Sequence, residues 1–252
     1  MKKAKSEPPA SEGRIVAMGG GGFSMEPENP LLDRYVLRLA RSPRPRICFL
    51  QPGDSPSYFE RFYAAFSRLP CEPAHLSLFS GGVADVRGFL LGQEVIYVGG
   101  GNTKSMLAVW REWGLDTILR EAWRSGAILT GLSAGAICWF GQGLTDSIPG
   151  SLTPLPCLGL LPGSACPHYD SEAERRPTYR AMVASGALAD GYAADDGVGL
   201  HFIGERLHRV VSSRPHARAY RVERVGDQAR ETEIVPEFLG GRILFDTIGK
   251  IA

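Results

Sequence analysis

The sequence predicts an α/β fold built on a mostly parallel, doubly wound sheet. Short apolar segments rich in β-branched residues end repeatedly in Gly or Pro turns, and segments with helical periodicity follow them. The chain has 252 residues, of which 44% are hydrophobic and 22% charged, which is enough for one large domain with a substantial core. We therefore predict a single domain over residues 14–252, preceded by a disordered tail over residues 1–13.

The first predicted strand occupies the start of residues 14–22 and runs into a glycine loop. A dinucleotide-binding fingerprint does not fit this loop, because Ser24 and Met25 stand where the last glycine of G-x-G-x-x-G is needed. A second strand, within residues 44–54, ends in a Pro-Gly turn. An amphipathic helix is predicted over residues 55–69, and its aromatic stripe is assigned to the core.

The same pattern continues through the middle of the chain. We predict a strand over residues 74–80, a short helix over residues 83–93, and a buried strand within residues 94–103 that breaks into three glycines. Helical periodicity then covers residues 104–126. In doubly wound sheets ligands bind outside the carboxyl ends of the strands, so the three-glycine turn is expected at the ligand-binding edge.

The segment Gly-Leu-Ser-Ala-Gly, residues 131–135, matches the G-x-S-x-G pattern of a nucleophile elbow. It joins a short apolar strand, residues 127–131, to the start of a helix at residues 136–140, and this is the context that the pattern requires. Small residues on both sides permit a tight turn that exposes the Ser133 hydroxyl and points the amide of Ala134 toward a developing oxyanion. We predict that Ser133 is a nucleophile.

A serine nucleophile needs a base, and the chain has five histidines. His168 stands in a loop-like stretch, residues 163–172, on the C-terminal side of the elbow. The other four occupy a predicted strand, a predicted hairpin or a polar turn, and are expected to be packing or surface residues: His75, His201, His208 and His216. We therefore assign the general base to His168.

The C-terminal part of the chain alternates apolar and polar residues around Gly-containing turns, over residues 199–213 and 217–238. This alternation predicts antiparallel strands appended to the main sheet. For residues 240–252 the sequence leaves two interpretations open, a last strand or an extension added for expression.

Composition argues against several classes of function. A formal net charge of +1 is too small to attract nucleic acid or an acidic membrane surface non-specifically. No stretch approaches the roughly 18 uninterrupted apolar residues of a transmembrane helix, and the N-terminus lacks an apolar signal core. Five cysteines show neither a CxxC pair nor a metal-like spacing, so we predict reduced thiols in a cytoplasmic protein with no metal site.

Four motifs together resemble one known family. They are GGGNT at residues 99–103, GLSAGAICWF at 131–140, TDS at 145–147 and PHYD at 167–170, in this order over most of the chain. In this combination the sequence resembles the peptidase E family of serine peptidases, which includes cyanophycinase. The resemblance implies a sheet fold related to class I glutamine amidotransferases, and a catalytic order of elbow serine, acidic residue and histidine.

Carried over position by position, the resemblance implies a catalytic triad. Ser133 matches the nucleophile, His168 the general base, and Asp146 the acidic residue that would orient the imidazole. Other carboxylates close to the histidine in sequence stay open as alternatives for the orienting role: Asp170, Glu172 and Glu174.

The resemblance also implies a substrate site. The amides of Gly100 and Ala134 would form the oxyanion hole, and Asn102 would line the same pocket. Peptidase E cleaves dipeptides with an N-terminal aspartate, whose carboxylate calls for a cation, and Arg175 and Arg176 stand in the matching region. Adjacent helical residues project differently, so at most one arginine is expected to reach the site, with Arg175 slightly favoured.

The function predicted from these observations is acyl-enzyme hydrolysis of a small peptide, without a cofactor, by a monomer or homodimer. Two alternatives stay open. One is the same hydrolytic mechanism on another substrate, such as a β-aspartyl peptide. The other is a non-catalytic binding protein of amidotransferase-like fold.

Overall fold

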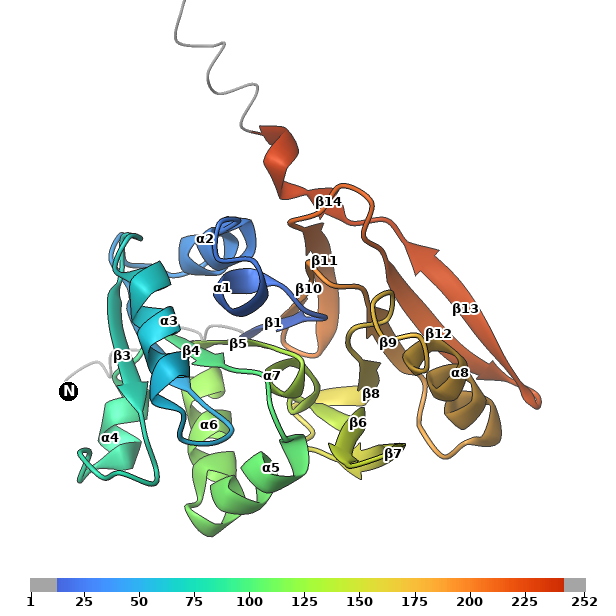
Figure 1. Ribbon diagram of the computed structural model, residues 1–252, viewed down its shortest axis with the longest axis horizontal. Coiled ribbons are helices and arrows are strands. Elements are labelled where there is room, and N and C mark those ends of the chain that lie inside the picture. Colours follow the sequence, from blue (N-terminus) through green and yellow to red (C-terminus); the bar gives the residue numbers. More distant parts are fainter. Residues whose placement is uncertain (1–12, 243–252) are drawn as a thin grey trace, which may run out of the picture.

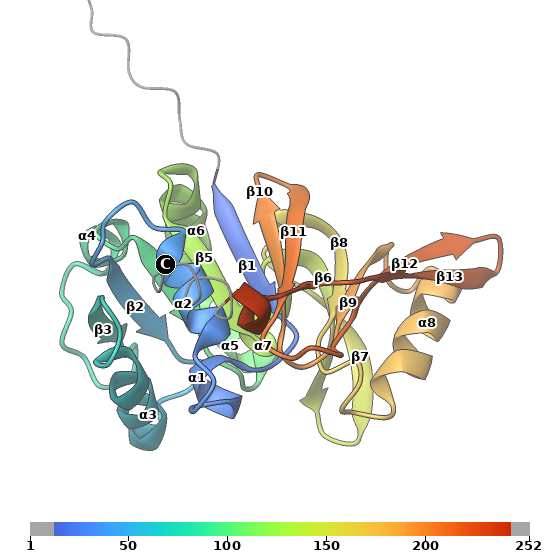
Figure 2. The same ribbon diagram turned by 90° about the horizontal axis from the view of Figure 1, so that it is seen from above.

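The computed structural model describes residues 13–242, which form two β-sheets and the helices that pack on them (Figure 1). The first sheet has eight strands in the order β14-β11-β10-β1-β5-β4-β2-β3, and the second has six in the order β13-β12-β9-β8-β6-β7. Viewed from above, the first sheet lies on the left with its helices, and the second lies on the right with α8 (Figure 2).

Five neighbouring parallel strands, from the middle of the first sheet to one edge, confirm the predicted mostly parallel α/β architecture. Four of them are buried along nearly their whole length, as expected for strands covered on both faces. The five strands, in spatial order, are β1 (Arg14–Met18), β5 (Ile128–Leu132), β4 (Val95–Val98), β2 (Arg46–Leu50) and the edge strand β3 (Glu72–Leu76).

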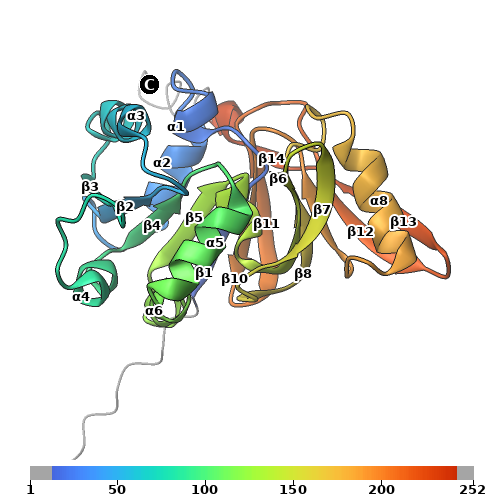
Figure 3. The same cartoon turned by 60° about the horizontal axis from the view of Figure 1, so that its bottom comes forward.

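Helices cover both faces of this sheet. One hydrophobic cluster joins it to α1 (Gly22–Met25), α2 (Leu31–Arg38) and α3 (Pro56–Phe66). Another joins it to α4 (Val86–Leu91), α5 (Thr103–Glu112) and α6 (Leu115–Arg124). Figure 3 shows α5 and α6 on the side that faces the viewer. The predicted helical stretch 104–126 is divided in two because Gly114 adopts φ +67°, a left-handed conformation that suits glycine.

The predicted C-terminal hairpin extends the first sheet. β10 (Val198–Ile203) and β11 (Arg206–Ser212) pair antiparallel, and β10 also pairs antiparallel with β1. The two-residue strand β14 (Glu237–Phe238) then pairs with β11. The expectation of antiparallel strands appended to the main sheet is confirmed for this hairpin. Within residues 217–238 the antiparallel pairing is also confirmed, but the two strands that form it belong to the second sheet.

The second sheet was not predicted as a separate unit. Its strands are β6 (Phe140–Ile148), β7 (Ser151–Pro156), β8 (Leu161–Cys166), β9 (Gly191–Ala194), β12 (Ala219–Val225) and β13 (Gln228–Ile234). It packs on the first sheet through contacts such as that between the Phe140 and Phe202 rings, whose centroids are 5.7 Å apart. The predicted helix at residues 136–140 is therefore only one turn, α7 (Ala134–Ile137), because Phe140 already begins β6.

One helix covers the second sheet. α8 (Arg175–Ser185) lies on it, and its buried Tyr179 and Val183 pack on the strands. A proline in the first turn, Pro177, suits a helix start because the first helical amides have no intrahelical partner.

No helix within residues 13–242 is long and apolar enough to cross a membrane. All five cysteines are free. Residues 1–12 and 243–252 lie outside the described part of the chain, so the assignments of the N-terminal tail, the domain limits and the last residues stay predictions.

A carboxyl group is buried beneath the glycine loop. Asp33 of α2 is 1% exposed, and among the described residues its Oδ1 has no hydrogen-bond partner. Burial raises the pKa of Asp33 to about 7. Since this value lies above that of the unfolded chain, ionisation of Asp33 destabilises the folded protein increasingly as the pH rises from about 4 to about 7.

Asp33→Asn is therefore expected to stabilise the protein relative to the wild type above pH 7, by roughly 2–4 kcal/mol, and to have little effect near pH 4. Urea unfolding of both proteins across this pH range measures the difference. A difference in unfolding free energy that does not grow with pH would contradict the assignment of the raised pKa to Asp33.

Candidate active site

Ser133 lies on a strained turn between β5 and α7. Its φ is +55°, and within residues 13–242 only Ser133 and His168, with φ +52°, are non-glycine residues at positive φ. Such a conformation costs of the order of 1–3 kcal/mol and is typical of a nucleophile elbow. The glycines on either side permit the turn, because a Cβ on Gly131 or Gly135 would collide with the carbonyl of Val98.

Three successive carbonyls at the end of β1, residues 18–20, hold the segments of the site together. The backbone amides of Ser133, His168 and Gly197 donate to them in this order, over 3.2, 3.0 and 3.1 Å. Three segments that are distant in sequence therefore meet at the carboxyl end of one central strand, where ligands bind in sheets of this kind.

The carboxylate that contacts the base is Asp196. Its Oδ1 lies 2.7 Å from Nδ1 of His168, and both side chains are buried. A carboxylate at Nδ1 fixes the tautomer in which Nδ1 carries the proton and Nε2 can accept one. The pair thus has the arrangement of a general base with its orienting acid.

The prediction that Asp146 orients the imidazole is wrong. Asp146 lies in β6 of the second sheet, its side chain is 67% exposed, and it faces Arg175 at 3.7 Å. Glu172 pairs with the same guanidinium over 2.7 Å. Glu174 directly precedes α8 and has no hydrogen bond to His168 among the described residues. The last alternative, Asp170, accepts a hydrogen bond from the backbone amide of Asp196 over 2.8 Å.

A signal for Asp196 was present in the sequence. The acidic pair Asp195–Asp196 follows β9 directly and precedes Gly197, so it occupies a turn at the end of a strand. Carboxylates at strand ends are candidates for catalysis in α/β folds. The sequence argument missed this pair because it sought the acid close to the elbow and the histidine along the chain.

The surroundings of Asp196 favour its charged form. Burial opposes ionisation, but hydrogen bonds and positive charge outweigh it, and the pKa of Asp196 lies below its ordinary value. The contributing groups are His168, Ser171 and Arg214. Arg214 lies 3.9 Å from the carboxylate and is itself held by Glu26 over 2.6 Å. Asp196 is therefore ionised at neutral pH, as its proposed role requires.

The glycine loop after β1 packs directly against His168 and Asp196. A Cβ on Gly20 would collide with the Asp196 carboxylate and would lie 3.1 Å from Nδ1 of His168. The loop that fails the dinucleotide pattern thus leaves room for two catalytic side chains.

Gly20→Ala is expected to displace the His168–Asp196 pair and to lower kcat by roughly 10²-fold, the usual effect of misplacing a catalytic group by about 1 Å. Gly53→Ala is the matched control, because an added methyl there meets only the Gln51 amide at 3.9 Å. Steady-state kinetics of the two variants test the prediction, and equal activities would show that the pair tolerates the methyl group.

The predicted oxyanion hole is present only in part. The amide of Ala134 belongs to the first residue of α7, and such amides have no intrahelical partner. The loop of Gly100 faces Ser133, since a Cβ on Gly100 would lie 3.5 Å from Cβ of the serine. However, the Gly100 amide donates to the Tyr58 hydroxyl over 3.0 Å, so it is not free for an oxyanion as predicted.

Asn102 has a structural role. Its Oδ1 accepts a hydrogen bond from the Ser105 amide over 2.9 Å and so caps α5. Its Nδ2 donates a hydrogen bond to the Ser147 carbonyl, also over 2.9 Å. These contacts tie the three-glycine loop to β6. Both polar ends of the side chain are engaged, so the geometry does not support the predicted contact with substrate.

Both candidate arginines are paired with acidic side chains. Arg175 is 2% exposed and bonds to Glu172 and to the Leu144 carbonyl. Arg176 pairs with Glu231, and its guanidinium lies over the ring of Tyr220 at 4.8 Å. Neither is a free cation that could meet a substrate carboxylate.

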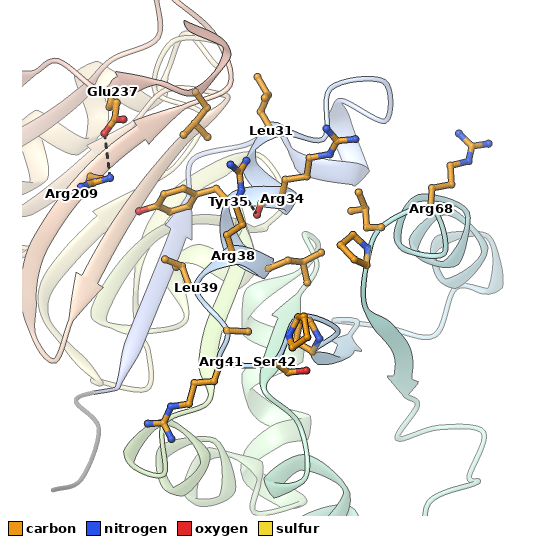
Figure 4. Close-up of a pocket in the computed structure, with 17 residues that line it drawn as sticks. Leu31, Arg34, Tyr35, Arg38, Leu39, Arg41, Ser42, Arg68, Arg209 and Glu237 are labelled. Carbon is orange, nitrogen blue, oxygen red and sulfur yellow. Dashed lines mark hydrogen bonds and ion pairs between the residues drawn. The ribbon is translucent and has the colours of Figure 1, made fainter. Parts of the chain in front are cut away.

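A cavity surrounded by arginines lies elsewhere (Figure 4). It has a volume of about 1120 Å³ and is lined by α2, by the segments that precede β2 and β3, and by Leu239. Five arginines surround it: Arg34, Arg38, Arg41, Arg68 and Arg209. None of Ser133, His168 and Asp196 lines it, so it is not the catalytic centre. Within residues 13–242 no cluster of metal-ligating side chains is present.

Comparisons with known proteins agree with this geometry. Residues 15–210 match the description Peptidase family S51. The chain is 53% identical over 229 residues to the uncharacterized peptidase YgaJ of Bacillus subtilis (strain 168), an alignment that covers 90% of this chain and 99% of YgaJ.

Two solved structures share the fold at low sequence identity. A peptidase from an acI-B1 actinobacterium superimposes with a TM-score of 0.65 at 15% identity, covering 90% of this chain and 96% of that one. A putative peptidase E protein from Listeria monocytogenes EGD-e superimposes with a TM-score of 0.56 at 17% identity, covering 79% of this chain and 97% of that one. Together with the match over residues 15–210, these findings show that the chain belongs to peptidase family S51.

Proposed function

We propose that the chain is a serine peptidase that hydrolyses short peptides through an acyl-enzyme, with Ser133 as nucleophile, His168 as general base and Asp196 as the acid that orients it. The observation that carries this proposal is the buried 2.7 Å contact of His168 with Asp196, held by the same strand end as the Ser133 elbow. Three residues with complementary roles converge at one sheet edge.

The proposed reaction has two steps. His168 Nε2 takes the proton of Ser133 as Oγ attacks the scissile carbonyl, and the resulting oxyanion is stabilised by the amide of Ala134. His168 then gives the proton to the leaving amine, and the C–N bond breaks to leave an ester on Ser133. A water molecule, deprotonated by His168, attacks this ester and releases the acid product and the free serine.

Labelling with a fluorophosphonate probe tests the catalytic proposal. We expect the wild type to be labelled at Ser133, and His168→Ala to react far more slowly, because the serine then lacks its base. Labelling that persists in Ser133→Ala would contradict the proposal. Absence of labelling in the wild type would favour a non-catalytic binding protein.

Dipeptides with an N-terminal aspartate are the proposed substrates, and this part rests on family membership alone, since Arg175 and Arg176 are both engaged in ion pairs. Hydrolysis of Asp-Leu, Glu-Leu, Ala-Leu and β-Asp-Leu under the same conditions tests it. A preference other than Asp-Leu would identify the same mechanism on another substrate. The five free thiols support a cytoplasmic location for this activity. That the protein is a monomer or a homodimer stays a prediction.

A further inference from the structure

Tyr58 contacts the glycine loop that faces the proposed nucleophile, although the aromatic side chains of its helix were predicted to pack in the core. It stands in the first turn of α3 and is 8% exposed. Its hydroxyl oxygen accepts the Gly100 amide over 3.0 Å, and Gly100 packs against Ser133. The Tyr58 hydroxyl is therefore bonded directly to Gly100, the residue that faces the elbow.

The proton of this hydroxyl has no acceptor within residues 13–242. A tyrosine hydroxyl can donate one hydrogen bond while it accepts another. Here the accepting side is used by Gly100, and the hydrogen bond recorded for Tyr58 in the described chain is that one. The Tyr58 hydroxyl can therefore still donate one hydrogen bond, and a group that arrives with the substrate can accept it.

We propose that Tyr58 donates its hydroxyl hydrogen bond to the oxyanion formed at Ser133, together with the amide of Ala134. This inference rests on the proposed serine peptidase function. The Gly100 amide then acts indirectly, because a hydrogen bond donated to a hydroxyl oxygen makes that hydroxyl a stronger donor. Tyr58 keeps its proton throughout the reaction, so the step requires no additional base.

The ring of Tyr58 is held in place, as an oxyanion donor requires. Its centroid lies 5.0 Å from that of Phe49 and 5.7 Å from that of Phe23, and the guanidinium of Arg61 lies 4.7 Å from it. A donor fixed before the reaction needs no reorganisation as charge develops.

A competing interpretation is that Tyr58 only occupies the Gly100 amide and releases it when substrate binds. The two interpretations predict opposite results for Tyr58→Phe. If Tyr58 is a donor, removing the hydroxyl lowers kcat. If Tyr58 only blocks the amide, the variant frees that amide, and kcat stays the same or rises.

Kinetics of Tyr58→Phe decide between them. We expect kcat to fall by about 10²-fold with KM near the wild-type value, as for loss of one oxyanion donor. Affinity for a peptide aldehyde, whose adduct with Ser133 places an oxygen in the oxyanion position, should fall with it, while affinity for the dipeptide product should not. The control is Tyr63→Phe in the same helix, whose hydroxyl bonds to His75 over 2.9 Å.

If Tyr58→Phe matches Tyr63→Phe in kcat and in aldehyde affinity, the proposal is overturned. A parallel assay of Ser133→Ala separates this failure from failure of the proposed function. Full activity of Ser133→Ala would refute the serine mechanism itself, whereas an inactive Ser133→Ala with a normal Tyr58→Phe would refute only the role of Tyr58.

Discussion

Ser133→Ala is expected to abolish peptide hydrolysis, with a loss in kcat of about 10⁶-fold, the size found when a triad nucleophile is removed. The substitution deletes the attacking oxygen and leaves the methylene carbon that packs beside Gly100. Alanine can adopt the backbone of this turn at a cost similar to that of serine, since both carry a Cβ. Fold and substrate binding should therefore be retained.

The measurement is kcat of the purified variant with the best dipeptide, together with its thermal unfolding and its affinity for substrate. Ser105→Ala, on the exposed surface of α5, is the matched control and should behave as the wild type. Turnover by pure Ser133→Ala at the wild-type rate would refute the role of Ser133 as nucleophile.

Asp196→Asn is expected to lower kcat on the order of 10⁴-fold, because the amide keeps the shape of the carboxylate but favours the wrong imidazole tautomer. His168 would then present a protonated Nε2 to Ser133 and could not act as a base. Stability at neutral pH should fall modestly, since the surroundings favour the charged form of Asp196 and the amide carries no charge. Kinetics and urea unfolding of the same preparation measure both effects.

Asp146→Asn is the control for this experiment. Its side chain is mostly exposed and faces Arg175, so the variant should keep nearly full activity. The opposite outcome, an active Asp196→Asn with an inactive Asp146→Asn, would show that the catalytic enzyme adopts a different arrangement around His168.

The elbow and the histidine that pairs with a carboxylate could be predicted because their signals are local. Gly131 and Gly135 surround Ser133 within five residues, and His168 stands in a loop of its own. The parallel strands were equally accessible, since each is an apolar run that ends in a turn. In both cases neighbours along the chain carry the information.

The orienting acid could not be found in the same way. Asp196 lies 28 residues after His168. The two meet because the amides of His168 and Gly197 donate hydrogen bonds to successive carbonyls of the same glycine loop. Such proximity depends on strand order, which a local pattern does not contain. The second sheet was missed for a related reason, because it mixes parallel and antiparallel pairings, and β9 pairs with β8 and β12, which lie on the far sides of intervening segments.

The substrate arginines failed as a prediction for a different physical reason. A sequence shows that Arg175 and Arg176 stand near the histidine, but not which acids neutralise them. Glu231, which pairs with Arg176, comes from β13, far along the chain. Arginine charge that looks free in the sequence is therefore neutralised in the folded protein, by Glu172 for Arg175 and by a glutamate of a distant strand for Arg176.

The three carbonyls at the end of β1 have a consequence for biosynthesis. They bind one segment from each of three regions that leave the ribosome at different times, and the last of these, around residue 197, emerges after three quarters of the chain has been made. The first strand to be synthesised must wait for β10 before its antiparallel pairing can form. A nascent chain thus carries Ser133 long before His168 can pair with Asp196, so the assembled site can exist only after most of these residues have been made.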